Sequence, residues 1–158
     1  MNHTLRWINP QDIKFVSQFM REHDRIEWQL MSSSKTSSME TIIRDAVDRS
    51  SFSMAAVNND TVIALFGVVP LSDTPAIGSI WALTTENVEL PSVYRPWFKI
   101  SKQLVHSIGK PFDRLENLVH EKNTKAIKFI HLIGFKILDE PKVIKGERFF
   151  PFYMDFIK

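Results

Sequence analysis

The sequence predicts an α/β domain, in which strands and helices alternate along most of the chain. Two patterns carry this prediction. Residues 52–69 read as a β-hairpin, because two apolar runs flank Asn58-Asn59-Asp60, whose residue types accept positive φ angles. Residues 114–143 read as a strand, a short apolar helix and a second strand. With 158 residues, we expect one domain, 1–158, that is large enough to bury a core.

The composition excludes several classes of protein. The chain has no cysteine, so neither a disulfide framework nor a thiolate zinc site is expected. No cluster has the spacing of metal ligands, and no run of about 18 apolar residues predicts a membrane span. Aromatic residues do not alternate with a basic stripe, so nucleic-acid binding is not predicted.

The charge is unevenly distributed along the chain. Residues 1–79 hold 7 Lys and Arg against 9 Asp and Glu, whereas residues 80–158 hold 13 against 9. A basic second half suits an anionic cofactor or an acidic partner, although such an excess is more often just a solvated surface.

The chain opens with a predicted strand at residues 4–8, followed by a helix. Asn9 can cap this helix, Pro10 suits its first position, and Asp12 can return a carboxylate to the free N–H groups. Apolar residues at helical spacing continue the pattern, which predicts one helix as far as Glu27.

A polar break at residues 32–38 separates this helix from a second one. Ser37 and Glu40 have the spacing of a capping box that opens the second helix. In the hairpin that follows, Gly67 indicates a bulge or a close approach of the backbone. Residues 77–86 then predict a further strand.

The remaining elements follow from one amphipathic face and three strand patterns. From Trp97 onward, apolar residues recur at helical spacing as far as Ile108. Strands are predicted at 114–120, at 137–143 and at 149–156, the last after a turn at Lys145-Gly146.

The segment from Asn123 to Phe135 is the most informative part of the sequence. Asn123 can cap a helix that is apolar over most of its surface. Gly134 stands where such a helix ends in a left-handed residue, and Phe135 provides the hydrophobic contact that often follows.

This segment, with Asn123, Ala126, Phe129 and Gly134-Phe135 between two strands, resembles the last conserved motif of the GNAT acyltransferases, which use acetyl-CoA. The order of predicted elements is also similar to the GNAT layout along nearly the whole chain, although the sequence itself resembles the family only from about residue 77 onward. The resemblance implies a mixed, mostly antiparallel sheet flanked by helices.

The resemblance also implies an acetyl-CoA site at the turn from the fourth strand into the third helix. The family pattern there is Gln/Arg-x-x-Gly-x-Gly/Ala, whose free N–H groups bind the pyrophosphate. Arg95 takes the first position, but Phe98 and Ile100 replace the glycines and Pro96 removes one N–H. Losing two such contacts costs about 3–6 kcal/mol, so acetyl-CoA binding is possible but doubted. The candidate cofactor-binding residues are Arg95, Lys99, Ser101 and Asn123.

The expected acid and base are also incomplete. Many family members carry a tyrosine, four residues after the alanine, that protonates the leaving thiolate, and Ile130 stands at that position. Transfer to an amine also requires a base. Glu86, near the end of the fourth strand, is the first candidate, and Glu116 or His120 on the fifth is the second. The catalytic candidates are therefore Glu86 and His120, and no metal is expected.

These departures resemble a phage branch of the same fold, which includes small internal virion proteins. The residues that carry this narrower resemblance are Asn123, Ile127, Gly134-Phe135 and the Phe-rich segment 149–152. It implies a non-catalytic protein that binds other virion or host proteins, located in the virion or in the cytoplasm of an infected bacterium. Two alternatives remain: an acetyl-CoA-dependent N-acetyltransferase with an altered pyrophosphate loop, and an inhibitor of a host enzyme.

Overall fold

The structure of the protein, a computed structural model, describes residues 3–33 and 37–156. The helices are α1 (Pro10–Phe19), α2 (Glu22–Met31), α3 (Met39–Arg49), α4 (Pro91–Gly109) and α5 (Thr124–Ile133), with a 3-10 helix η1 (Glu86–Glu89). The strands are β1 (His3–Trp7), β2 (Phe52–Asn58), β3 (Thr61–Pro70), β4 (Ile77–Thr84), β5 (Arg114–His120), β6 (Lys136–Ile137), β7 (Lys142–Ile144) and β8 (Glu147–Asp155).

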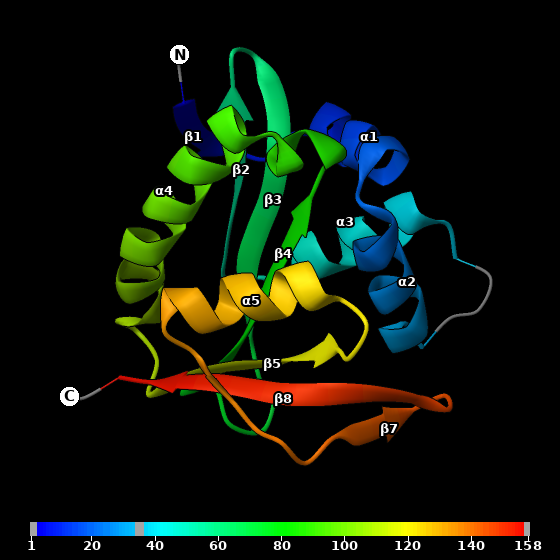
Figure 1. Ribbon diagram of the computed structural model, residues 1–158, viewed down its shortest axis with the longest axis vertical. Coiled ribbons are helices and arrows are strands. Elements are labelled where there is room, and N and C mark those ends of the chain that lie inside the picture. The colour runs from blue at the N-terminus through cyan, green and yellow to red at the C-terminus, as the bar shows by residue number, and fades with distance from the viewer. Residues whose placement is uncertain (1–2, 34–36, 157–158) are drawn as a thin grey trace.

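All eight strands form one mixed sheet in the order β1-β2-β3-β4-β5-β8-β6, with β7 paired to β8. Among the described residues, every pair of named strands is antiparallel except β4 and β5. The predicted fold class, a mostly antiparallel mixed sheet flanked by helices, is therefore confirmed. Figure 1 shows α4 and α5 on one side of the sheet and α1 to α3 on the other.

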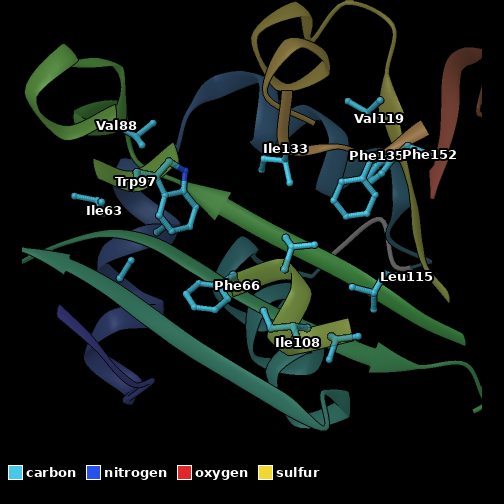
Figure 2. Close-up of a cluster of buried hydrophobic side chains, with 14 of the residues drawn as sticks. Ile63, Phe66, Val88, Trp97, Ile108, Leu115, Val119, Ile133, Phe135 and Phe152 are labelled. Carbon is cyan, nitrogen blue, oxygen red and sulfur yellow. The ribbon is translucent and has the colours of Figure 1, made fainter. Parts of the chain in front are cut away.

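Each face of the sheet buries its own hydrophobic core. Between the sheet and the α4–α5 side lies a cluster that includes Phe66, Trp97, Leu115 and Phe152 (Figure 2). A second cluster lies between the opposite face and the α1 and α3 helices, and Ile43 at its centre is fully buried. The two cores hold the sheet in place and leave its middle for the site.

The pairing of β4 with β5 ends early. The parallel register joins only residues 77–79 of β4 to residues 114–116 of β5. Beyond this point β4 continues with β3, and β5 continues with β8. The two strands therefore diverge toward their C-terminal ends, and α5 crosses in front of the opening (Figure 1).

Local sequence signals decide the ends of several elements. Asn9 and Asp12 form the predicted capping box, with Asn9 Oδ1 accepting the Asp12 N–H at 2.9 Å. At the end of α5, Gly134 adopts a φ of 121°, and the Phe135 N–H binds the Ile130 carbonyl, as in a Schellman motif. A Cβ on Gly67 would lie 2.6 Å from the Phe52 carbonyl oxygen, which confirms the predicted close approach.

The predicted helix from Asn9 to Glu27 is wrong in one respect, because it is two helices. The chain leaves helical geometry at Met20 and Arg21, where the Arg21 N–H binds the Thr84 carbonyl at 2.9 Å and Met20 bridges to Thr85. This contact with the end of β4 interrupts the helix and starts α2 in a new orientation.

Three further boundaries differ from the sequence prediction. The cap of α3 is Ser38, whose hydroxyl accepts the Thr41 N–H, rather than Ser37. The helix α4 begins at Pro91, six residues before the predicted start, because Leu90 already accepts two helical N–H bonds. The strand predicted at 137–143 is divided into β6 and β7. Part of the predicted polar break, residues 34–36, lies outside the described residues.

Candidate functional site

A cavity of about 1200 Å³ reaches both sides of the sheet at the point where β4 and β5 separate. On one side its walls come from α2 and α3, and on the other from α4 and α5. Ala82 of β4, an exposed residue, also lines it. The opening between the strands therefore connects two chambers, one on each face.

Charged side chains of α2 and its N-terminal neighbour are buried at this opening. Arg21 and Asp24 are only 8% and 7% exposed. The Arg21 guanidinium lies 3.4 Å from Asp24 Oδ1 and donates to Glu89 Oε1 at 3.1 Å. Burying charges in this way is costly unless they are paired and hydrogen-bonded, so the cluster indicates a function beyond packing.

Two carboxylates of α2 bind the main chain of both diverging strands. Asp24 Oδ2 accepts the Thr84 N–H on β4 at 3.0 Å. Glu27 Oε1 accepts the His120 N–H on β5 at 2.9 Å. Because the residues are three apart on α2, they lie on the same side of the helix and bridge the opening.

Burial raises the pKa of both carboxyl groups. The pKa of Glu27 rises to about 7, chiefly because the group is removed from water, and hydrogen bonds from Asn123 and His120 only partly oppose this. Burial also raises the pKa of Asp24, against the nearby positive charge of Arg21. A carboxyl group with a pKa near 7 gains and loses a proton close to neutral pH.

Asn123 connects this cluster to α5. It stands at the N-cap of α5, as predicted, but its side chain makes no capping hydrogen bond. Its Nδ2 donates to Glu27 Oε1 at 2.9 Å, and its Oδ1 accepts from Arg21 at 3.4 Å. Its exposed fraction is 0%, so the amide serves the buried cluster rather than the helix end.

Side chains of other elements bind most of the main-chain N–H and C=O groups on the edge of β4 that faces the opening. Asn117 Nδ2 donates to the Ile80 carbonyl, and Thr84 binds Asp24. Main-chain groups on one edge of a strand recur every second residue, which places the N–H and C=O of Ala82 on this same edge. Ala82 is therefore the position where a ligand can reach the main chain of β4.

Aromatic rings fill the space between α4 and α5. Trp97 and Phe129 lie parallel, with ring centroids 6.2 Å apart and an interplanar angle of 4°. Phe98 contacts Phe129 edge to face, and Tyr94 stacks on Phe98. Bulky rings therefore stand where the two helices come closest to each other.

The segment predicted to hold a pyrophosphate lies inside α4. Residues 95–101 are in the middle of a continuous helix, so their N–H groups are used within it, and Pro96 has none. No glycine lets a ligand approach this stretch. The residues that the sequence assigned to the CoA diphosphate therefore do not fit that group, because the turn from β4 into α4 lies earlier, at residues 85–90.

The sequence-predicted site residues fall in different places. Glu86 is exposed in η1 and does not line the large cavity. The His120 ring lies against Phe149, and its Nε2 is buried, 3.7 Å from Glu147 and without a hydrogen bond in the described part of the chain. Asn123 lies at the opening, whereas His120 contributes only its main-chain N–H there.

The predicted cofactor residues on α4 also separate. Arg95 and Lys99 are exposed on the outer side of the helix. Ser101 lines the cavity, and its buried hydroxyl has no hydrogen-bond partner among the described residues. Ile130, at the position of the family tyrosine, lines the cavity as well and offers no proton.

Sequence reasoning missed Arg21, Asp24 and Glu27. The available signal was the density of charge, since residues 21–28 contain five charged side chains together with Trp28. In the described residues, no group of three or more His, Cys, Asp or Glu side chains is placed to hold a metal ion. Among the helices whose residues are described, none combines the length and the apolar character that crossing a bilayer requires.

Comparisons with known proteins show the fold. The chain is similar to the ribosomal-protein-alanine N-acetyltransferase from Brucella melitensis, with a TM-score of 0.70 and 12% identity over 97% of this chain and 99% of that one. It is similar to the spermidine N-acetyltransferase from Vibrio cholerae in complex with CoA and spermine, with a TM-score of 0.67 and 13% identity over 97% and 95% of the two chains.

A third similar structure is an acetyltransferase of the GNAT family from Streptococcus pneumoniae, with a TM-score of 0.60 and 13% identity over 98% of this chain and 99% of that chain. No protein-family model matches the sequence, and no curated protein is significantly similar to it. The protein thus has the GNAT fold.

Proposed function

We propose that the protein transfers an acyl group from a thioester to an amine, and that the Glu27 carboxylate is the general base. One observation carries this proposal: a carboxyl group with a pKa of about 7 stands in the cavity where β4 and β5 diverge. Such a group accepts a proton from nitrogen near neutral pH and releases it again. Strongly perturbed carboxyl groups in cavities are typical of catalytic sites.

The acceptor enters from the side of α2 and α3. Trp28, Met31 and Ile42 give this chamber apolar walls. Asp24 and Asp45 also line it, each paired with an arginine, and Glu27 adds a carboxylate. An amine with an apolar body suits such walls, because its nitrogen can reach the carboxylates while its carbon atoms contact the rings. The similar spermidine N-acetyltransferase from Vibrio cholerae holds spermine, an amine, which supports this chemistry.

In the reaction, a neutral amine attacks the thioester carbonyl carbon. The C–N bond forms, the C–S bond breaks, and the nitrogen gives one proton to Glu27. The thiolate leaves and takes up a proton, so the products are an amide and a thiol. The Ala82 N–H, on the open edge of β4, is in position to stabilise the negative charge that develops on the carbonyl oxygen.

The test is thiol release from S-acetyl-pantetheine and acetyl-CoA, with 2-phenylethylamine and spermidine as acceptors. We expect Glu27→Gln to lower kcat about 10²–10⁴-fold, the usual contribution of a general base. The matched control is Glu22→Gln on the same helix, where the carboxylate side chain is 74% exposed. Wild-type turnover in Glu27→Gln, or a wild-type rate profile with no inflection near pH 7, would contradict the role of Glu27.

A second proposal is a non-catalytic protein that uses the cleft or its aromatic surface to bind another protein. The parallel Trp97 and Phe129 rings support it, because they give the cavity an aromatic wall that a protein partner can contact. Absence of turnover with every donor, together with no thermal shift up to millimolar acetyl-CoA, would favour it. The phage origin, the role in virion assembly or infection, the virion or cytoplasmic location and the inhibition of a host enzyme remain predictions.

A further inference from the structure

We infer that the acyl donor is a phosphopantetheine thioester on an acidic carrier protein, which docks on the exposed surface of α4 and α5, rather than acetyl-CoA. This inference rests on the proposed acyl transfer and adds the identity of the donor. The part of the cavity between the sheet and the helices α4 and α5 is called the donor chamber here. Its inner end lies at the opening between β4 and β5, its outer end lies at the start of α4, and the two ends suit different parts of a ligand. The inner end suits a thioester arm, whereas the outer end does not suit a nucleoside diphosphate.

The outer end lacks the main-chain donors that a diphosphate needs. A phosphate site at a helix start depends on several free N–H groups and on close approach of the backbone. In the first turn of α4, Pro91 has no N–H and the N–H groups of Val93 and Tyr94 bind the Leu90 carbonyl, which leaves only the N–H of Ser92 in this turn for a ligand. Residues 95–101 are in the helix interior. A ligand that keeps its phosphate at the protein surface avoids this requirement.

The helices α4 and α5 carry a net positive charge, although η1, directly before α4, adds Glu86 and Glu89. The sequences of α4 and α5 contain no Asp or Glu, whereas they contain five Lys and Arg residues. The helices on the opposite face contain seven acidic residues and four Lys and Arg residues. Charge separation of this kind steers a partner of opposite sign to one face of a protein.

Four of the five basic side chains are available to a partner. Lys125 pairs with Glu89 at 3.2 Å. The other four are exposed and have no ion pair in the described part of the chain: Arg95, Lys99, Lys102 and Lys128. Exposed charges contribute little one by one, but several on one face attract an acidic partner together.

The basic stripe of α4 borders the side of the helix that faces α5. At 100° per residue, Arg95, Lys99 and Lys102 follow one another beside Phe98. Phe98 contacts Phe129 of α5, so the stripe flanks the seam between the two helices. A carrier docked over Arg95, Lys99 and Lys128 would place its prosthetic group beside these rings, where Trp97 and Phe129 line the cavity.

The inner chamber suits the arm that such a carrier presents. Its walls are mainly apolar, with Trp97, Leu104 and Ile130 among the lining residues. The Ser101 hydroxyl, buried in the chamber wall, lacks a hydrogen-bond partner among the described residues. Pantetheine is a slender chain with two amides, and one of these amides can satisfy this hydroxyl.

The experiment compares two donors with the full-length protein. An acidic bacterial acyl carrier protein is loaded with acetyl-phosphopantetheine, and acetyl-CoA is the alternative. Binding of the fluorescently labelled holo-carrier is measured by anisotropy, independently of turnover, and transfer to 2-phenylethylamine is followed by thiol release. The test variant is Lys99→Glu/Lys102→Glu. The control is Lys14→Glu/Lys142→Glu, which changes the net charge equally at exposed positions on α1 and β7.

We expect the carrier-bound donor to give a kcat/KM at least about tenfold above that of acetyl-CoA. We also expect Lys99→Glu/Lys102→Glu to weaken carrier binding about tenfold or more, with the control unchanged and with weaker binding at higher salt. Micromolar saturation by acetyl-CoA with equal or better turnover would overturn the inference and leave the acyltransferase proposal standing. Carrier binding without turnover from either donor would support docking and overturn the acyltransferase proposal. No carrier binding would overturn the inference.

Discussion

Replacing Glu27 by Gln should stabilise the protein at alkaline pH. Burial removes the Glu27 carboxylate from water and raises its pKa from 4.5 to about 7. Each pKa unit corresponds to 1.36 kcal/mol, so ionised Glu27 costs the folded state about 3 kcal/mol as an upper figure. In Glu27→Gln, the new amide carbonyl could still accept the N–H of His120 and the Nδ2–H of Asn123, both now 2.9 Å from Oε1.

The pH dependence of this effect has a definite sign. The folded state holds the Glu27 proton more tightly than the unfolded chain does, because the pKa is raised on folding. Between about pH 4.5 and 7 the folded state therefore binds more protons, and stability falls as pH rises. Below this window the group is protonated in both states and costs nothing. The increase in the free energy of unfolding caused by Glu27→Gln should therefore be near zero at pH 4 and largest at pH 8.

The measurement is the free energy of unfolding by urea at pH 4, 6 and 8, for the wild type and Glu27→Gln. Glu22→Gln is the control, because it removes the same charge from an exposed position on the same helix. A stability difference between Glu27→Gln and the wild type that stays constant from pH 4 to pH 8 would refute the raised pKa. It would also remove the observation on which the proposed base depends.

Three substitutions test the backbone features that position the site, each by urea unfolding. Gly67→Ala should destabilise by about 1–3 kcal/mol, since its Cβ would lie 2.6 Å from the Phe52 carbonyl oxygen, and an unchanged midpoint would disprove the close approach. Asn9→Ala should cost about 1 kcal/mol through the lost cap of α1, and no loss would mean the cap is not formed in solution. Gly134→Ala should cost about 1 kcal/mol because its φ is 121°, and a stabilising effect would contradict that conformation.

Elements governed by neighbouring residues could be predicted from the sequence. The strand at 114–120 and the end of the helix at Gly134 agree with the structure, because strand alternation and the C-terminal glycine act over a few residues. The turn at Asn59 and Asp60 also forms with positive φ angles at both residues. In these places local chemistry alone decides the conformation.

The break between α1 and α2 could not be predicted in this way. No Gly or Pro marks it, and the contact that causes it joins Arg21 to Thr84, far along the chain. Because the helical phase restarts at Glu22, His23 is exposed and Asp24 is buried. A single continuous helix would put His23 on the side of the apolar residues, which conceals the role of Asp24.

The site itself shows why its residues escaped detection. Glu27 meets His120 and Asn123 only after the sheet has formed, so no short motif contains them. These side chains also differ from the usual patterns that sequence prediction relies on. Glu27 is a buried carboxylate, and Asn123 stands at an N-cap without forming the capping hydrogen bond, and both features lower local stability.

Such conflicts have a physical meaning when they gather in one place. A cluster that served folding alone would be more stable with apolar or neutral side chains, since buried ion pairs rarely stabilise a protein as much as well-packed hydrocarbon does. Here Arg21, Asp24 and Glu27 are instead placed at an opening that connects the two faces of the sheet. In the proposed reaction the donor would enter beside the aromatic seam at Trp97, whereas the carboxylates would be reached from the α2 side. The costs of burial and the location of the cavity therefore favour a site that performs chemistry over a relic of one.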